Sequence, residues 1–265
     1  MTPQLTLRLS EGQNPALLAK GFDCIAEGCC FPMLYNDDVV IPGVERSMHL
    51  SPEAAQHYYP LGCGEYMVGW RSPSVLCCGW NVGKTLDAAL HGGRSRGQQV
   101  GPVVPEPQAM ESFEDLYQAV MLQIRHCAQT TARYYAAVLS TVPKDCPFLL
   151  ASLLTEGCLE SGKGILEGAE HVGACVMGHG FTNAADSLAA IREVVYVKKL
   201  ATLPQVVSAL DDDFIGHEDL REALLASHKF GNDLDEVDLL LSRLWGDMNQ
   251  AADEAGRKEG LQFLT

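Results

Sequence analysis

The stretch that decides the fold of this chain is Tyr59-Pro-Leu-Gly-Cys63-Gly-Glu65-Tyr66. It places a thiol and a carboxylate two residues apart, among glycines and next to a proline. Side chains at positions i and i+2 do not face each other on a helix, but they point to the same side of an extended segment. Cys63 and Glu65 can therefore converge on one bound molecule. The spacing also fits a buried structural cysteine beside a solvated glutamate, because cysteine is among the most buried residue types.

Further segments precede and follow this loop in a fixed order. The first is Asn36-Asp-Asp-Val-Val-Ile-Pro42, and Asn81-Val-Gly-Lys-Thr-Leu-Asp-Ala-Ala-Leu90-His-Gly-Gly93 comes after the loop. The later ones are Pro147-Phe148, Gly157-Cys-Leu-Glu-Ser-Gly-Lys163, Asn183-Ala-Ala-Asp-Ser-Leu-Ala-Ala-Ile191 and Lys229-Phe-Gly-Asn-Asp233. The ordered set resembles the glycyl radical enzymes, the pyruvate formate-lyase superfamily, over nearly the whole chain.

The resemblance implies an α/β fold. Enzymes of this superfamily contain an α/β barrel of two five-stranded half-sheets surrounded by helices. We expect residues 1–265 to form one partial barrel domain that carries the cysteine loop at about residues 60–66 and supplies only some of the strands. Exposed sheet edges and apolar surface are then expected for the chain on its own.

The resemblance also implies a chemistry for the loop. In the superfamily, a glycyl radical takes a hydrogen atom from a loop cysteine, and the resulting thiyl radical takes a hydrogen atom from the substrate. A glutamate two residues further on transfers a proton in many members. Carried onto this sequence, Cys63 is the thiyl site and Glu65 the proton-transfer residue. A poorly solvated loop suits both roles, because burial keeps a thiol protonated and raises the pKa of a carboxyl group.

The residue after Cys63 indicates the branch of the superfamily. Members that cleave acyl carbon–carbon bonds have two adjacent loop cysteines, whereas Cys63 is followed by Gly64. The resemblance is therefore to the Cys-x-Glu branch, which eliminates water or other leaving groups, or decarboxylates. Acyl transfer of the pyruvate formate-lyase type is an alternative that would need Cys77-Cys78, for which packing is the favoured interpretation.

The glycine motif of the superfamily, Arg-Val-x-Gly followed by Tyr or Phe, does not occur in the sequence. We therefore expect an internal piece of a longer enzyme, without the glycyl radical domain and inactive by itself. The resemblance implies a protein-based radical from a segment outside this chain, no bound cofactor, a radical SAM activating enzyme, a small-molecule substrate and a homodimer of the full-length form. The alternative is a split or degenerate member that acts only as a binding module.

Composition limits the class of protein. The 265 residues are 47% hydrophobic and 20% charged, which is ordinary for a globular chain with a sizeable core. A net charge of −15 argues against a nucleic-acid partner, which requires clustered basic residues. We find no signal peptide and no apolar run long enough for a membrane span, so no membrane partner is expected. The ten cysteines lack C-x-x-C spacing, which disfavours zinc and, without a signal peptide, indicates free thiols in a reducing cytoplasm.

Two other segments match a known binding motif only in part, one a phosphate-binding loop and the other a calcium-binding loop. Gly79-Trp-Asn-Val-Gly-Lys84-Thr has three residues between its first glycine and Gly-Lys, one fewer than a phosphate-binding P-loop needs. Lys84 is instead expected on a helix surface. Asp211-Asp-Asp213 lacks the alternating ligands and closing glutamate of a calcium loop, so a solvated turn is favoured.

Hydrophobic periodicity and capping residues predict the local structure. A strand is expected in residues 1–10, a turn at 36–38 with Asp37 and Asp38 as a solvated acid pair, a loop at 92–107 and a buried strand with a turn at 171–180. Helices are expected at 15–27, from 51, and at 81–90, 112–142, 148–160, 183–199, 203–211, 217–228 and 234–258.

Overall fold

The computed structural model describes residues 4–61, 65–73 and 77–264, and the chain divides into two compact units. Unit 1 consists of Met1–Cys78, Tyr134–Met177 and Glu259–Thr265. Unit 2 consists of Gly79–Arg133 and Gly178–Lys258. Because the chain passes between the units several times, each unit is assembled from segments that are distant in sequence.

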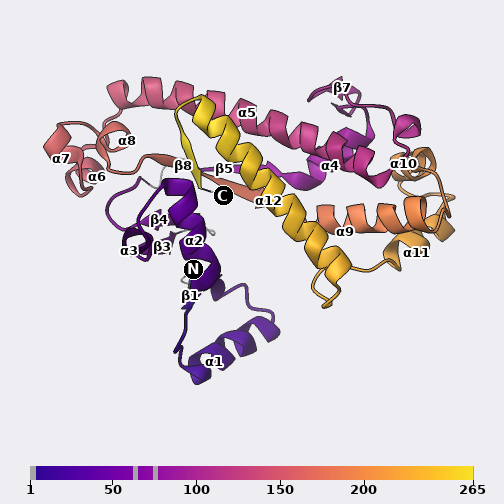
Figure 1. Ribbon diagram of the computed structural model, residues 1–265, viewed down its shortest axis with the longest axis horizontal. Helices are drawn as coiled ribbons and strands as arrows, with labels where there is room; N and C mark the ends of the chain where they lie inside the picture. Colours follow the sequence, from indigo (N-terminus) through magenta and orange to yellow (C-terminus); the bar gives the residue numbers. More distant parts are fainter. Residues whose placement is uncertain (1–3, 62–64, 74–76, 265) are drawn as a thin grey trace. The chain divides into compact units, whose positions relative to one another are not determined.

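Unit 1 contains most of the strands (Figure 1). In chain order it holds β1 (Thr6–Leu9), α1 (Pro15–Ala26), β2 (Met33–Asn36), α2 (Asp37–Met48), α3 (Pro52–Ala55), β3 (Tyr58–Leu61) and β4 (Glu65–Val68). It also contains the start of β5 (Cys77–Asn81), the end of α5 (Phe113–Asp145), α6 (Leu149–Leu153), α7 (Cys158–Ser161), α8 (Ile165–Gly168), most of β8 (Gly173–His179) and β9 (Gln262–Leu264).

The described strands form small sheets. β1 pairs in parallel with β2, and β3 pairs in antiparallel fashion with β4, so that Leu61 is opposite Glu65. A third sheet has the order β5-β8-β9, in which β8 and β9 are parallel. The chain is thus mixed α/β, as the sequence predicts at that level.

The core of unit 1 lies between α2 and the β3–β4 hairpin. Val44, Met48, Ala55, Tyr58 and Val68 are each at most 2% exposed and pack together. The side chain of Cys175 from β8 packs against this cluster. The cluster therefore connects the hairpin that carries Glu65 to a strand from far along the chain.

The predicted turn at 36–38 is wrong, because α2 begins at Asp37 with Asn36 as its N-cap. The Asn36 Oδ1 accepts a hydrogen bond from the Asp38 backbone N–H at 3.1 Å. Asp37 is not a solvated acid, because Arg8 donates to its carboxylate with Nε at 2.8 Å and Nη2 at 2.9 Å. The Tyr58 hydroxyl donates to the same carboxylate at 2.6 Å.

Unit 2 is mainly helical. It contains the end of β5, α4 (Val82–Leu90), the two-residue strands β6 (Arg94–Ser95) and β7 (Gln98–Gln99), the short 3-10 helix η1 (Pro107–Ala109) and the first part of α5. After β8 come α9 (Phe181–Ile191), the π-helical turn η2 (Arg192–Val197), α10 (Leu203–Asp211), α11 (Glu218–Leu225) and α12 (Asp235–Lys258).

The core of unit 2 is built on α12, which packs against α9 (Figure 1). Leu188 of α9 and Leu244 and Met248 of α12 are fully buried. The rings of Phe181 and Trp245 lie 4.9 Å apart between their centroids. Towards α5, the Tyr117 hydroxyl donates to the Asp247 carboxylate at 2.7 Å.

Capping residues explain why several predicted helices are confirmed. Asn81 caps α4 by accepting from the Lys84 backbone N–H at 3.0 Å, and Ser51 caps α3 by accepting from Ala54 N–H at 3.2 Å. Ser112 accepts from the Asp115 N–H at 3.2 Å, while the Asp115 carboxylate accepts from Ser112 N–H at 2.8 Å.

Two local predictions are wrong. The helix expected at 148–160 is two short helices, α6 and α7, because Gly157 between them adopts φ +88°. A Cβ there would lie 2.6 Å from the Gly168 carbonyl oxygen, so only glycine fits at the break between the two helices. The loop expected at 92–107 contains the β6–β7 hairpin, whose turn residues Arg96 and Gly97 both have positive φ.

Large apolar side chains remain exposed in unit 1. Leu149 and Leu150 of α6 are 72% and 73% exposed, and Leu17 and Phe22 of α1 are each 51% exposed. Apolar surface was expected from the sequence. No helix in the described part of the chain is long and apolar enough to cross a membrane.

Candidate functional site

The β3–β4 hairpin positions Glu65 at the first residue of β4. Glu65 is half-buried, and the hairpin is fixed by Tyr58 and Val68, each 1% exposed. Cys63, the predicted thiyl site, lies outside the described residues, as do its neighbours Gly62 and Gly64. Its proposed role therefore stays a prediction.

Glu65 lies beside a second cysteine that comes from another strand. The Sγ of Cys77, the first residue of β5, donates a hydrogen bond to Glu65 Oε1 at 3.4 Å. Burial raises the pKa of the Cys77 thiol to about 11, and the hydrogen bond and negative charge of Glu65 act in the same direction. Cys77 is therefore a protonated thiol at neutral pH, with its hydrogen directed at the carboxylate.

Two further side chains complete these surroundings. Cys175 of β8 is in side-chain hydrogen-bonding contact with Cys77. Burial raises the pKa of the Tyr35 phenol on β2, and the nearby Cys175 and Glu65 raise it further. Strands β2, β4, β5 and β8 thus bring a phenol, a carboxylate and two thiols together in one unit.

Cys78 contacts a different residue from Cys77, because successive side chains along a strand point to opposite faces. Its side chain is hydrogen-bonded to the Tyr135 hydroxyl, and burial followed by the nearby Cys78 raises the pKa of that phenol. Tyr135 is only 4% exposed and packs edge-on against Phe263 at 6.4 Å between ring centroids. Packing, the interpretation favoured from the sequence for both cysteines, describes Cys78 well.

The arrangement around Glu65 suits proton transfer and hydrogen-atom chemistry. The carboxylate has a fixed neutral donor nearby, the Cys77 thiol, whose raised pKa keeps it in the protonated form. The sequence contains no signal for Cys175 and Tyr35, and it favoured packing for Cys77. No local pattern could have found them, because the three residues are brought to Glu65 only by the pairing and packing of separate strands.

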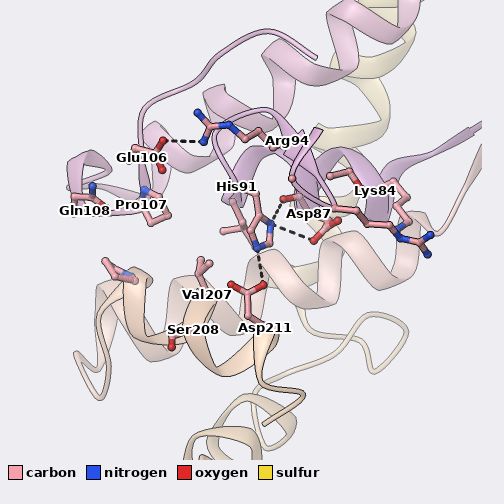
Figure 2. Close-up of a pocket in the computed structure, with 15 residues that line it drawn as sticks. Lys84, Asp87, His91, Arg94, Glu106, Pro107, Gln108, Val207, Ser208 and Asp211 are labelled. Atoms are coloured by element: carbon pink, nitrogen blue, oxygen red, sulfur yellow. Dashed lines mark hydrogen bonds and ion pairs between the residues drawn. The ribbon is translucent and has the colours of Figure 1, made fainter. Parts of the chain in front are cut away.

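A cavity is formed by residues of unit 2 (Figure 2). It has a volume of about 730 Å³ and is lined by residues of α4, α10 and the β6–β7 segment. His91 lies between two carboxylates. Its Nδ1 is 2.7 Å from the Asp87 carbonyl oxygen and its Nε2 is 3.1 Å from Asp211 Oδ1. Arg94 forms an ion pair with Glu106 at 3.4 Å across the cavity rim.

Several charged groups of this cavity contact one another. Burial alone would lower the pKa of His91, but the hydrogen bonds to Asp87 and Asp211 outweigh it and raise the pKa. His91, directly after α4, thus links that helix to α10, and Asp211 is part of this link rather than only a solvated turn residue. Glu65 belongs to unit 1, whereas the residues that line this cavity belong to unit 2.

The described residues contain no set of metal ligands, because no three of their His, Cys, Asp or Glu side chains lie close enough together to hold an ion. The nine described cysteines are free thiols.

Comparison with known proteins identifies relatives of the kind that the order of the motifs predicts. The chain is 29% identical over 249 residues to (2S)-3-sulfopropanediol dehydratase of Klebsiella oxytoca, covering 90% of this chain and 29% of the relative. It is 30% identical over 256 residues to the probable dehydratase YbiW of Escherichia coli, covering 92% of this chain and 31% of the relative. The chain thus spans less than a third of the length of these relatives.

Solved structures show the same fold. The B12-independent glycerol dehydratase of Clostridium butyricum superposes with a TM-score of 0.87 at 25% identity, covering 99% of this chain and 34% of that chain. A structure on 1,2-propanediol dehydration in Roseburia inulinivorans superposes with a TM-score of 0.81 at 25% identity, covering 94% and 32% of the respective chains.

The family description "pyruvate formate lyase-like" matches residues 1–263. This match covers almost the whole sequence and includes the Cys63–Glu65 loop and the strands that surround Glu65. The chain therefore belongs to the pyruvate formate lyase-like family of glycyl radical enzymes.

Proposed function

We propose that this chain is the cysteine-loop part of a radical dehydratase or lyase that acts on a small hydroxylated metabolite, with Cys63 as the thiyl site and Glu65 as the proton-transfer residue. The observation that carries the proposal is the family match over residues 1–263, which contains both residues. The described surroundings of Glu65 support it, because a carboxylate beside a protonated thiol suits the required proton transfer.

A glycyl radical, contributed by a segment outside this sequence, supplies the hydrogen-atom abstraction that converts the Cys63 thiol to a thiyl radical. Cys63 then forms a new S–H bond with a hydrogen atom taken from a hydroxyl-bearing carbon of the substrate. Glu65 accepts the proton of that hydroxyl and delivers it to the adjacent hydroxyl, which leaves as water. Cys63 returns its hydrogen atom to the neighbouring carbon, so a diol becomes an aldehyde or ketone and one water.

The names of the relatives support elimination from a vicinal diol. A sulfopropanediol dehydratase and a glycerol dehydratase are among the similar proteins, and another similar structure concerns 1,2-propanediol dehydration. Their shared substrate feature is two hydroxyl groups on adjacent carbons. The chain's own Cys-x-Glu spacing agrees, since acyl transfer would need a second cysteine at position 64.

The same proposal includes the wider assembly. We infer that the small sheets of unit 1 are parts of a barrel completed by polypeptide outside this chain. A homodimer of the full-length form and a radical SAM activating enzyme are the proposed partners. A cytoplasmic location is proposed with them, because exposed thiols and a glycyl radical both require a reducing, oxygen-poor compartment.

The test uses the full-length polypeptide, activated without oxygen by its radical SAM enzyme. Glycerol, propane-1,2-diol and 3-sulfopropane-1,2-diol are supplied separately, and carbonyl products are measured by NMR alongside the radical signal by electron paramagnetic resonance. We expect one diol to give product and Glu65→Gln to lower turnover at least about 100-fold, the scale of lost acid–base catalysis, at equal radical content. Full turnover by Glu65→Gln would contradict the assigned role, and no product from any diol despite a full radical signal would overturn the substrate class.

A further inference from the structure

Two cationic side chains that line the cavity shown in Figure 2 have no partner among the described residues. Lys84 lies on α4, and Arg96 lies in the turn between β6 and β7. Neither side chain forms a hydrogen bond or an ion pair with any residue that the structure describes. Both are exposed, so both are accessible to a dissolved molecule.

The acidic side chains of the same cavity are already in contact with basic ones. The ring of His91 lies 3.3 Å from Asp87 Oδ1 through Nδ1 and 3.1 Å from Asp211 Oδ1 through Nε2. Glu106 lies 3.4 Å from Nη1 of Arg94. The two unpartnered cations are therefore the charged groups of the cavity that remain available to a ligand, and the ligand that they attract is an anion.

The backbone of Arg96 is unusual for an arginine. Its φ is +49°, and the φ of Gly97 is +76°, as a two-residue hairpin turn with two left-handed positions requires. Such positions favour glycine, asparagine and aspartate, because a longer side chain is strained there. Turn geometry therefore does not account for an arginine at position 96, whereas a role for its guanidinium in the cavity does.

The hairpin that carries Arg96 is held firmly against α4. Gln99 Nε2 donates to the carbonyl oxygens of Gly93 at 3.0 Å and Gly101 at 2.7 Å. The Gly93 N–H donates to the carbonyl oxygen of Ala88 in α4 at 2.7 Å. Because α4 also carries Lys84, the two cations are presented by elements that are fixed to each other, which lowers the entropic cost of binding one ligand with both.

The chemistry of these groups indicates a phosphate. A guanidinium can form two parallel hydrogen bonds to phosphate oxygens, and an ammonium binds the same group as a point charge. The volume of about 730 Å³ is within the range of small-molecule sites and exceeds what a phosphate ion alone would fill. Leu90, Pro204 and Val207 add apolar lining for an organic part, and Ser208 adds a hydroxyl (Figure 2).

We propose that this cavity binds a small organic phosphate, whose phosphate group is held by Arg96 and Lys84. The site does not depend on a P-loop, because the groups that bind are two side chains and not a run of backbone N–H groups. It is also independent of the reaction proposed for Cys63 and Glu65, so it can be tested without a radical.

The experiment is isothermal titration calorimetry of the full-length polypeptide, without activation and at constant ionic strength. The probes are glycerol 3-phosphate and ribose 5-phosphate, and glycerate carries a carboxylate for comparison. We expect saturable binding of at least one phosphate, and binding at least about tenfold weaker in Arg96→Asn and in Lys84→Gln, because each change removes a charged donor. Arg257→Gln is the matched control and should bind like the unaltered protein, since Arg257 is an exposed arginine of α12 outside the cavity lining.

Thermal unfolding separates lost binding from lost folding. Arg96→Asn should melt at or above the temperature of the unaltered protein, because asparagine tolerates a positive φ better than arginine does. Lys84→Gln, a change at an exposed helix position, decides the test if Arg96→Asn melts early.

Four results would overturn the proposal. They are no saturable binding of either phosphate, equal affinity for glycerate, undiminished binding in both cavity variants, and an equal loss of affinity in Arg257→Gln. The last result would mean that general charge, and not this cavity, attracts the anion.

Discussion

The carboxylate of Asp37 joins β1, α2 and β3 in unit 1. Arg8 donates two hydrogen bonds to it, and the guanidinium lies 4.0 Å from the centre of the Tyr58 ring. The Tyr58 hydroxyl donates to the same carboxylate at 2.6 Å, and its side chain is 1% exposed. This network supports the strand that leads into the cysteine loop.

Removal of this carboxylate should destabilise unit 1. We expect Asp37→Ala to lower the free energy of unfolding by about 1–3 kcal/mol, because Arg8 and Tyr58 lose a largely buried acceptor. The measurement is urea unfolding at pH 7. Asp38→Ala is the matched control, since Asp38 lies next in the same helical turn but is exposed, and it should cost less than about 1 kcal/mol. Equal losses for the two variants would contradict the network.

The same residue predicts an acid dependence of stability. The hydrogen bond from Arg8 outweighs burial and holds the pKa of Asp37 below its ordinary value. A depressed pKa in the folded state stabilises the protein above the unfolded value of about 3.9 and is lost as pH falls through the folded value. The difference in unfolding free energy between the unaltered protein and Asp37→Asn should be constant above about pH 5 and shrink below about pH 4. A difference that is independent of pH down to pH 2 would refute this.

At the scale of single residues, the sequence predicted one member of the site's described surroundings. Glu65 was found from its spacing to Cys63, which needs only the alternation of an extended segment. Cys77, Cys175 and Tyr35 could not be found, because each reaches Glu65 through a strand that is fixed by long-range packing. Asp37 was misjudged for a similar reason, since its partner Arg8 lies 29 positions away in sequence.

At the scale of elements, the surroundings of two glycines, Gly178 and Gly246, differ in whether they leave room for a side chain. Position 178 in β8 has no room for a side chain, since a Cβ added to Gly178 would lie 1.9 Å from Cε2 of the Phe181 ring. Phe181 cannot yield easily, because it is 8% exposed and packs against Trp245. Position 246 in α12 has room for a side chain, because no neighbouring atom lies within 4 Å of a Cβ added to Gly246.

Alanine substitutions at these two glycines should therefore have opposite effects. We expect Gly178→Ala to destabilise the protein by about 1–3 kcal/mol through overpacking. Gly246→Ala should be neutral or stabilising by up to about 1 kcal/mol, because alanine is the better helix former. Thermal unfolding of both variants measures this. An unchanged stability in Gly178→Ala would contradict the close packing of β8 against Phe181 of α9, and a loss in Gly246→Ala would contradict the open surroundings of that position in α12.

Element prediction succeeded where the determinants are local. The helices that begin at Pro52, Val82 and Phe113 follow from their capping residues, and α12 follows from its periodic apolar face. It failed at 148–160, because the contact that requires glycine at Gly157 is with Gly168, outside the segment. It also failed at 36–38, where the same asparagine and aspartates that favour a turn instead cap a helix.

At the scale of the whole molecule, the apolar surface of unit 1 should govern solution behaviour. Leu149 and Leu150 of α6 are more than 70% exposed, and exposed apolar groups promote association. We expect the double change Leu149→Gln and Leu150→Gln to reduce self-association of the 265-residue chain in sedimentation velocity. The melting temperature should change little, since these side chains bury little area. Unchanged association would show that α6 is not the associating surface.

The family and the mixed α/β class could be predicted from the order of motifs, which is a property of the whole sequence. The assembly of each unit from distant segments could not, because periodicity and capping describe only neighbours along the chain. The pairing of β5 with β8, and of β8 with β9, depends on side chains from separate parts of the sequence meeting in one core.

Cys63 is proposed to carry the reacting radical. The most direct measurement compares turnover per glycyl radical in the activated full-length polypeptide for Cys63→Ala and Cys78→Ala, with the radical counted by electron paramagnetic resonance. We predict a full radical signal in both, no product from Cys63→Ala, and turnover by Cys78→Ala close to that of the unaltered protein. Product formation by Cys63→Ala at a normal rate would contradict the claim.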